Sequence, residues 1–130
     1  MTLPPPHPGP RLVVITCGAQ GATALTARHH ITVPAPRTYV VDTIGAGDAF
    51  QSSLLDALLT PDGTVRIPAT PTELEPALRR CVTAGAITCT HAGARPPTHE
   101  EIRSAQAADD VIQARQAHPL AQEATTRTRG

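Results

Sequence analysis

The stretch from Val40 to Phe50 holds the residues whose types and spacing could do chemistry. Gly45 and Gly47 allow positive φ angles and let the backbone come close to a ligand. The free N–H groups and the positive dipole at a helix N-terminus then form an anion site. Asp48 lies in the first turn of that helix, where an ionised carboxylate can take a proton from a hydroxyl group. An anion site beside a carboxylate is what phosphoryl transfer to an alcohol requires.

The same stretch also has a purely structural interpretation. A Gly-Ala-Gly turn before a helix is often only a turn, and Asp48 could do no more than compensate the helix dipole. The short pattern leaves both interpretations open. The longer string around it favours the chemical one.

That string, DTIGAGDAF at residues 42–50, resembles the DTxGAGDxF motif of the ribokinase/PfkB family of sugar kinases, with every fixed position occupied. The resemblance implies that Asp48 is the catalytic base. It also implies that the amides of Gly45, Ala46 and Gly47 form the anion hole for the γ-phosphate of ATP. The longer phrase VPAPRTYVVDTIGAGDAF is similar to the bacterial fructokinase branch of the family.

Two further segments resemble the same family. TCGAQG at residues 16–21 is similar to its TxGxxG segment, which turns beneath the nucleotide, and TAGAITCTHAGARPPT at 83–98 is similar to the segment that walls the adenine. The resemblance implies these ATP-binding residues: Thr16, Gly18, Gly21, Gly47, Cys81 and Gly85. It implies a monovalent cation site, with K⁺ as the expected ion, built from the backbone carbonyls of Asp42, Ile44, Thr88, His91 and Gly93.

Apolar patterning predicts the elements that position these residues. The run Arg11–Thr16 indicates a strand buried on both faces in a parallel sheet. Shorter strands are expected at 22–26, at 29–34 and at Thr38–Val41. A helix from Ala46 to about Leu59 carries one wide apolar stripe, at Phe50, Leu54, Leu55, Leu58 and Leu59, and is expected to pack on the sheet.

Two later helices follow. Thr72 and Glu75 have the spacing of a capping box, and the helix they begin would run to about Thr90, with Gly93 as its C-terminal cap. Gly85 would let this helix approach another backbone closely. A third, short helix is expected from Thr98 to about Ala107.

The chain of 130 residues is long enough for one domain at most. Residues 1–10 read as a proline-rich extended leader, 11–107 as a partial ribokinase-like ATP-binding domain, and 108–130 as a disordered or frayed tail. The fold class is therefore α/β: the C-terminal portion of a ribokinase-like three-layer α/β/α fold, with an incomplete sheet. The sugar-gripping N-terminal part of the family pattern has no counterpart in the chain.

Composition excludes other classes of function. The net charge is zero and aromatic residues are 2%, so there is no basic stripe with stacking aromatics and nucleic-acid binding is not expected. No apolar run reaches the length of a membrane span, and a cytoplasmic protein is the default. The His29-His30 pair has no third ligand in register for a metal.

Two hypotheses remain. The first is a fructokinase-like carbohydrate kinase, present here as the nucleotide and anion-hole half, that uses ATP, Mg²⁺ and K⁺. Its substrate would be a sugar or sugar-derived alcohol, and the chain would form a homodimer or pair with a missing N-terminal half. The second is a non-catalytic, nucleotide-binding or partner-pairing remnant of such a kinase. Binding without turnover would favour the second.

Overall fold

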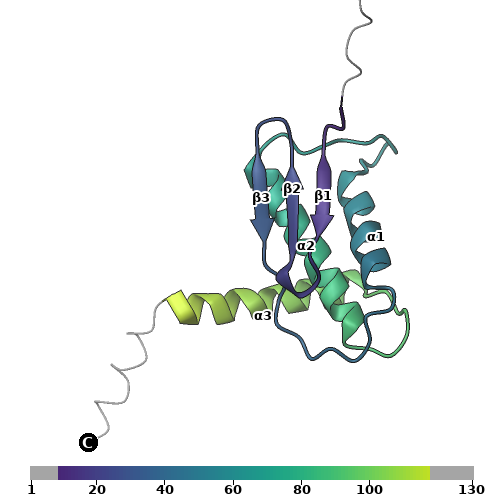
Figure 1. The fold of residues 1–130 in the computed structure, drawn as a ribbon, viewed down its shortest axis with the longest axis vertical. Coiled ribbons are helices and arrows are strands. Elements are labelled where there is room, and N and C mark those ends of the chain that lie inside the picture. Colours follow the sequence, from purple (N-terminus) through teal and green to yellow (C-terminus); the bar gives the residue numbers. More distant parts are fainter. Residues whose placement is uncertain (1–8, 118–130) are drawn as a thin grey trace, which may run out of the picture.

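The computed structural model of the chain describes residues 9–117, so most of the predicted leader and the end of the predicted tail lie outside it. Three strands form one antiparallel sheet in the order β1 (Val13–Thr16), β2 (Ala22–Leu25), β3 (His30–Val33) (Figure 1). A single 3₁₀ turn, η1 (Gly18–Gln20), connects the first two strands. Three helices follow: α1 (Ala46–Leu58), α2 (Pro71–Cys89) and α3 (His99–Ala117).

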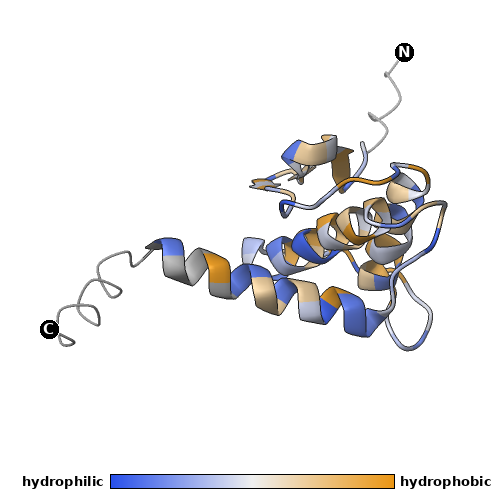
Figure 2. Cartoon of the chain, turned by 90° about the horizontal axis from the view of Figure 1, so that it is seen from below, coloured by the Kyte–Doolittle hydropathy of each residue, from blue (hydrophilic) through white to orange (hydrophobic). Residues whose placement is uncertain are grey.

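The elements stack in layers. Helix α2 packs behind β2 and β3, α1 packs against α2, and α3 contacts α2 on the side away from the sheet (Figures 1 and 2). The other face of the sheet carries no helix within residues 9–117. The α/β class predicted from the sequence is confirmed, and the described residues show part of the three-layer arrangement.

The prediction that the first strand is buried on both faces of a parallel sheet is wrong. β1 pairs antiparallel with β2, with Val13 opposite Leu25 and Thr16 opposite Ala22. Its outward side chains are open to solvent, and Ile15 is 48% exposed. An apolar run predicts a hydrophobic strand, but it does not predict which neighbouring elements cover that strand.

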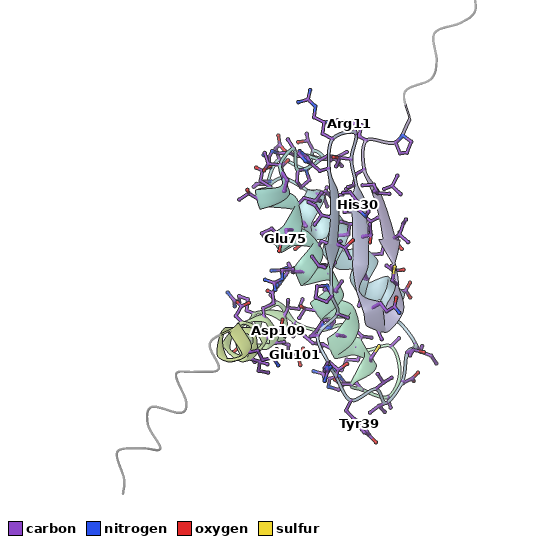
Figure 3. The ribbon with its side chains drawn as sticks, turned by 60° about the vertical axis from the view of Figure 1, so that its left-hand side comes forward. Arg11, His30, Tyr39, Glu75, Glu101 and Asp109 are labelled. Atoms are coloured by element: carbon purple, nitrogen blue, oxygen red, sulfur yellow. The ribbon has the colours of Figure 1, made fainter. Side chains whose placement is uncertain are left out.

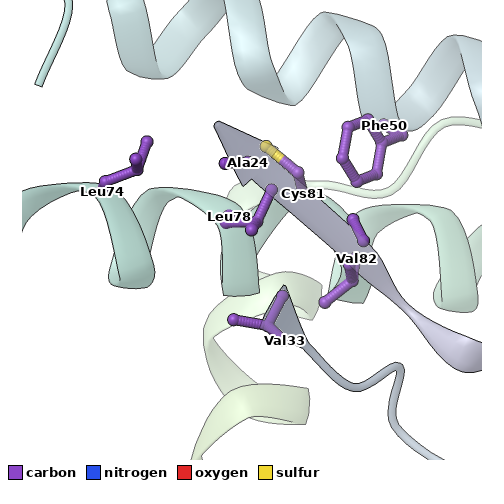
Figure 4. Close-up of a cluster of buried hydrophobic side chains, with 8 residues drawn as sticks. Ala24, Val33, Phe50, Leu74, Leu78, Cys81 and Val82 are labelled. Atoms are coloured by element: carbon purple, nitrogen blue, oxygen red, sulfur yellow. The ribbon is translucent and has the colours of Figure 1, made fainter. Parts of the chain in front are cut away.

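The core lies between the sheet and the two inner helices. Small residues of β2, Ala22 and Ala24, let α2 approach the sheet closely, and side chains from β3, α1 and α2 fill the space around them (Figure 4). The buried cluster consists of Ala22, Ala24, Val33, Phe50, Leu74, Leu78, Cys81 and Val82. The single phenylalanine is the one aromatic ring in it, so aliphatic packing carries most of the burial free energy.

Helix α1 forms where the sequence predicts it, but its apolar stripe does not all face the interior. Phe50 is buried, whereas Leu55 and Leu59 are 55% and 51% exposed. The helix packs mainly on α2 rather than on the sheet. Gly85 of α2 permits this contact, as predicted, because a Cβ there would lie 3.3 Å from the carbonyl oxygen of Ala46.

Helix α2 begins two residues earlier than the predicted capping box. Thr70 is the N-cap, its hydroxyl accepts from the Glu73 amide, and Pro71 occupies the first helical position. The Glu73 carboxylate accepts from the amide of Ala69, the residue before the N-cap, at 3.2 Å, so it holds the chain entering the helix without the N-cap amide bond of a full capping box. The Thr-x-x-Glu spacing occurs twice, at Thr70–Glu73 and at Thr72–Glu75. Pro71 at the first helical position favours the earlier pair.

Helix α3 begins as predicted and runs further. The Thr98 hydroxyl accepts from the Glu101 amide, while the Glu101 carboxylate accepts from the Thr98 amide at 2.7 Å. Ile102 anchors the helix against the body, and the helix continues to Ala117, whereas the sequence predicts an end near Ala107.

No strand forms at Thr38–Val41. The segment is extended, and the amides of Val41 and Asp42 both donate to one acceptor, the Cys89 carbonyl, at 2.8 and 3.1 Å. One shared carbonyl cannot form a ladder, so the β-prone residues are held against the end of α2 instead. Tyr39 projects from this segment and is 86% exposed (Figure 3).

Gly21 joins η1 to β2 in a conformation that other residues rarely adopt. Its φ is +100°, and a Cβ would lie 1.9 Å from the Val33 carbonyl oxygen. We expect Gly21→Ala to lower the free energy of unfolding by about 3 kcal/mol, measured by urea denaturation. Gly63→Ala is the matched control, because Gly63 has φ +81° but open space around it, and about 1 kcal/mol of strain is expected there. Equal losses in the two variants would contradict the close approach at Gly21.

Candidate functional site

A cavity of about 580 Å³ opens beside the N-terminus of α1. Three parts of the chain that lie far apart in sequence line it. They are the β1–β2 connection, the extended segment with the turn into α1, and the C-terminal half of α2. The lining residues are Thr16, Gly18, Ala19, Gly21, Ala35, Pro36, Arg37, Thr38, Val40, Thr43, Ala46, Gly47, Phe50, Val82, Gly85, Ala86 and Cys89.

The turn into α1, residues Gly45–Gly47, is the predicted anion hole. Gly45 is the N-cap with φ +80°, and a Cβ there would lie 2.7 Å from the Ala94 Cβ, so only glycine fits. The Ala46 amide donates to the Thr43 carbonyl at 3.2 Å and closes the turn. Among the described residues, the Gly47 and Asp48 amides donate to no backbone carbonyl. These two amides, more than that of Ala46, are available to an anion.

Asp48 lies in the first turn of α1 and is exposed. It follows directly on Gly47, which lines the cavity, but is not itself one of the lining residues. A carboxylate here can accept a proton from a group that lies against the outer face of α1.

Asp42 connects the two loops that frame the turn. Its Oδ1 accepts from the Ile44 amide at 3.0 Å, and its Oδ2 accepts from the Gly93 amide at 3.0 Å. These backbone N–H groups, Ile44 first and then Gly93, hold the pKa of the Asp42 carboxyl below its usual value. The loop before α1 is thereby fixed to the loop after α2.

The predicted ATP-binding residues fall into the cavity with one exception. Thr16, Gly18, Gly21, Gly47 and Gly85 all line it. Cys81 does not, because its side chain is fully buried in the core, where burial raises the pKa of the thiol to about 11. Cys89, on the same helix, lines the cavity instead. Both cysteines lie on one apolar face of α2. The helical periodicity does not distinguish the part of that face that packs in the core, at Cys81, from the part that lines the cavity, at Cys89.

Four of the five predicted cation ligands, Asp42, Ile44, His91 and Gly93, belong to the two loops that Asp42 connects, and the fifth, Thr88, lies in the last turn of α2. Gly93, expected to cap α2, lies beyond the observed cap, Thr90, and has φ +76°. The carbonyl of Thr88 accepts from the Thr90 and His91 amides, and that of Gly93 accepts from the Arg95 amide. A carbonyl oxygen has two lone pairs, so that of Gly93 keeps one for a cation, whereas both of those on Thr88 already face N–H groups. Across residues 9–117 no three His, Cys, Asp or Glu side chains gather as a metal cluster.

One wall of the cavity was not predicted from the sequence. The extended segment contributes Ala35, Pro36, Arg37, Thr38 and Val40. The sequence predicted a strand at Thr38–Val41, and the side chains of a strand within a sheet are expected to pack against other elements rather than line a cavity. No helix within the described part of the chain has the length and apolar character of a membrane span.

A family model described as pfkB family carbohydrate kinase matches residues 3–101. Fructokinase-2 of Solanum habrochaites is 38% identical over 97 residues, which are 73% of this chain and 29% of that protein. The chain thus spans under a third of the length of such relatives.

Solved structures of similar fold carry ligands. Aminoimidazole riboside kinase from Salmonella enterica, complexed with aminoimidazole riboside and an ATP analog, superposes with a TM-score of 0.60 at 32% identity, over 72% of this chain and 31% of that one. A fructokinase double mutant from Vibrio cholerae O395, with fructose, ADP and potassium bound, gives 0.55 at 31% identity, over 65% and 26%.

The Asp42 bridge predicts a specific pH dependence. A carboxylate with a lowered pKa stabilises the fold above its ordinary value of 3.8 and loses that effect as the pH falls through the folded-state pKa. Asp42→Asn should therefore lower Tm at neutral pH, and its difference from the unmodified chain should shrink below about pH 4. Thermal unfolding followed by circular dichroism against pH measures this.

Asp62→Asn is the matched control. The pKa of Asp62 is also lowered, but its partners, Thr60 and Thr64, are in its own loop. Amide hydrogen exchange at Ile44 and Gly93 should accelerate in Asp42→Asn and stay unchanged in Asp62→Asn. Unchanged exchange in both variants would show that Asp42 does not connect the loops.

Proposed function

The chain belongs to the pfkB family of carbohydrate kinases, and on that premise we propose that it binds ATP in the cavity and supplies the base for phosphoryl transfer to a sugar hydroxyl. The observation that carries the proposal is the turn at Gly45–Gly47. The amides of Gly47 and Asp48 donate to no backbone carbonyl, Gly47 lines the cavity, and the Asp48 carboxylate follows directly on the exposed side. Phosphate site and base are thus built into one helix start.

The chemistry follows from these positions. The Asp48 carboxylate accepts the proton of the sugar hydroxyl as that oxygen bonds to the γ-phosphorus and the bond from phosphorus to the β-phosphate oxygen breaks. The products are a sugar phosphate, ADP and a protonated Asp48, which releases its proton to solvent. The amides of Gly47 and Asp48 donate to the transferring phosphoryl oxygens and offset the charge that develops on them.

The shape of the cavity supports a nucleotide. Gly18 lines the cavity with open space where a side chain would stand, and Val82 and Ala86 of α2 offer a flat base an apolar surface. We place the base against α2 and the phosphates at the turn into α1. That residues 11–107 form the nucleotide-facing unit stays a prediction.

Cofactors are proposed by analogy with the solved relatives. ADP and potassium are bound in the Vibrio fructokinase, so we propose that K⁺ binds the carbonyls of the two loops that Asp42 connects. Mg²⁺ would accompany ATP and shield its phosphate charge. Fructose is the first sugar to test, because the curated relatives include fructokinases. The cytoplasmic location expected from the sequence stays a prediction.

The sugar side of the site requires more protein than the described residues provide. Large apolar side chains on and beside α1 are exposed: Ile44, Leu55, Leu59 and Val65. Asp48 lies on this helix, so a segment that covered the face would also bring groups to the acceptor sugar. We propose that the sugar-binding half pairs here, in the same polypeptide or in another chain, and a homodimer is the other arrangement.

A second candidate function rests on the same exposed face. If nothing completes the sugar site, the chain acts as a nucleotide-binding module that pairs with a partner. Binding of ATP by the purified chain, together with no ADP release from any sugar in a panel, would favour this function.

Asp48→Asn separates chemistry from binding. With ATP, magnesium and fructose, we expect the variant to form ADP about 10²–10⁴-fold more slowly, because the attacking hydroxyl then lacks its base. Its ATP dissociation constant by calorimetry should match that of the unmodified chain. Asp56→Asn is the control, since Asp56 is an exposed acid later in the same helix, outside the cavity lining. Undiminished turnover in Asp48→Asn would end the assignment of the base.

Gly47→Ala tests the phosphate end of the cavity. A Cβ at Gly47 meets nothing within 4 Å, and alanine is the better helix former, so the variant should be more stable by up to about 1 kcal/mol. The added methyl group enters the cavity and should weaken ATP binding about tenfold. Ser52→Ala, on the exposed side of the same helix, should leave binding unchanged. A more stable Gly47→Ala that binds ATP normally would move the phosphates away from this turn.

A further inference from the structure

The cavity holds one charged side chain. Of its lining residues only Arg37 carries a charge, and the other polar side chains are the hydroxyls of Thr16, Thr38 and Thr43 and the thiol of Cys89. No carboxylate lines the cavity. A single cation in a mostly apolar, acid-free cavity favours an anionic occupant.

Arg37 has no competing partner. The ion pairs among the described residues involve other arginines, and Arg37 forms none of them. It is also the only arginine between Arg28 and Arg66, and the sequence has no lysine at all. An arginine that is neither paired nor buried adds nothing evident to the fold, so its charge is available to a ligand.

The backbone holds Arg37 at the cavity from both sides. Before it, the chain at Val33–Ala35 passes so close to Gly21 that a Cβ there would overlap it. After it, the amides of Val41 and Asp42 attach the segment to the end of α2. The segment also leads directly into the turn at Gly45–Gly47. Its extended form therefore keeps one long cationic side chain along the path from the base to the phosphates.

We propose that Arg37 binds the phosphates of the nucleotide and makes the cavity select charged nucleotides over the neutral nucleoside. The inference rests on the proposed function, because it places a nucleotide in this cavity. A guanidinium group forms paired, charge-assisted hydrogen bonds with phosphate oxygens, which a neutral side chain cannot replace. The amides of the turn and Arg37 then hold the phosphate chain from two elements.

The test is calorimetric titration of the full chain with ATP, ADP, AMP and adenosine. Arg37→Gln should weaken ATP and ADP binding about tenfold or more and leave adenosine binding unchanged. The ATP affinity of Arg37→Lys should fall between those of the unmodified chain and Arg37→Gln, because lysine keeps the charge but cannot form the paired hydrogen bonds of a guanidinium group. Added KCl should weaken ATP binding to the unmodified chain more steeply than to Arg37→Gln. All variants should keep the same Tm, since Arg37 is exposed.

Arg11→Gln is the matched control. Arg11 is exposed, has the same charge and lies at the opposite end of the molecule from Tyr39 in the extended segment (Figure 3). Equal loss of ATP affinity in Arg11→Gln would reduce the effect to net charge and overturn the inference. Equal ATP-to-adenosine preference in Arg37→Gln and the unmodified chain would overturn it while leaving the proposed function intact. If the unmodified chain bound none of the four compounds, the proposed function itself would fail, and the inference with it.

Discussion

The site depends on one carboxylate that accepts hydrogen bonds from two backbone N–H groups. Asp42 accepts from the Ile44 amide in its own loop and from the Gly93 amide in another loop. Gly93 lies fifty-one residues after Asp42 in the chain. Without that connection, the backbone hydrogen bonds that attach the extended segment to the end of α2 would be those of Val41 and Asp42 to the Cys89 carbonyl. The bridge turns two loops into a single rigid edge of the cavity, because each bond fixes the backbone of a loop that has no ladder of its own.

The fold combines close approaches that only small residues permit. Ala22 and Ala24 bring α2 to the sheet, Gly85 brings α1 to α2, and Gly45 lets the turn pass beside Ala94. Because aromatic residues are scarce, contact density has to come from short distances between elements rather than from large side chains. Small residues also line much of the cavity beside the turn, and their short side chains leave it open.

Local signals in the sequence predicted the site better than they predicted the packing around it. The turn at Gly45–Gly47, the acid in the first helical turn and the glycines of the cavity follow from short-range stereochemistry, which a few residues determine. The burial of Cys81, the exposure of Leu55 and the loss of the strand at Thr38–Val41 depend on which elements become neighbours. Periodicity reveals that a helix has an apolar face, but not how much of that face finds a partner. The register of α2 was missed because two Thr-x-x-Glu boxes compete there, and only Pro71 distinguishes them.

The contact between Gly45 and Ala94 has a mechanical consequence. The turn at Gly45 packs directly against Ala94 in the loop after α2. Any small shift of α2 therefore moves the turn as well. A substitution deep in the interior, at Leu78 for example, could tilt α2 and re-aim the first amides of α1 without touching the cavity. The direction in which these amides point is therefore a property of the helix packing as a whole. Natural variation among aliphatic core residues could tune it while every polar group stays the same.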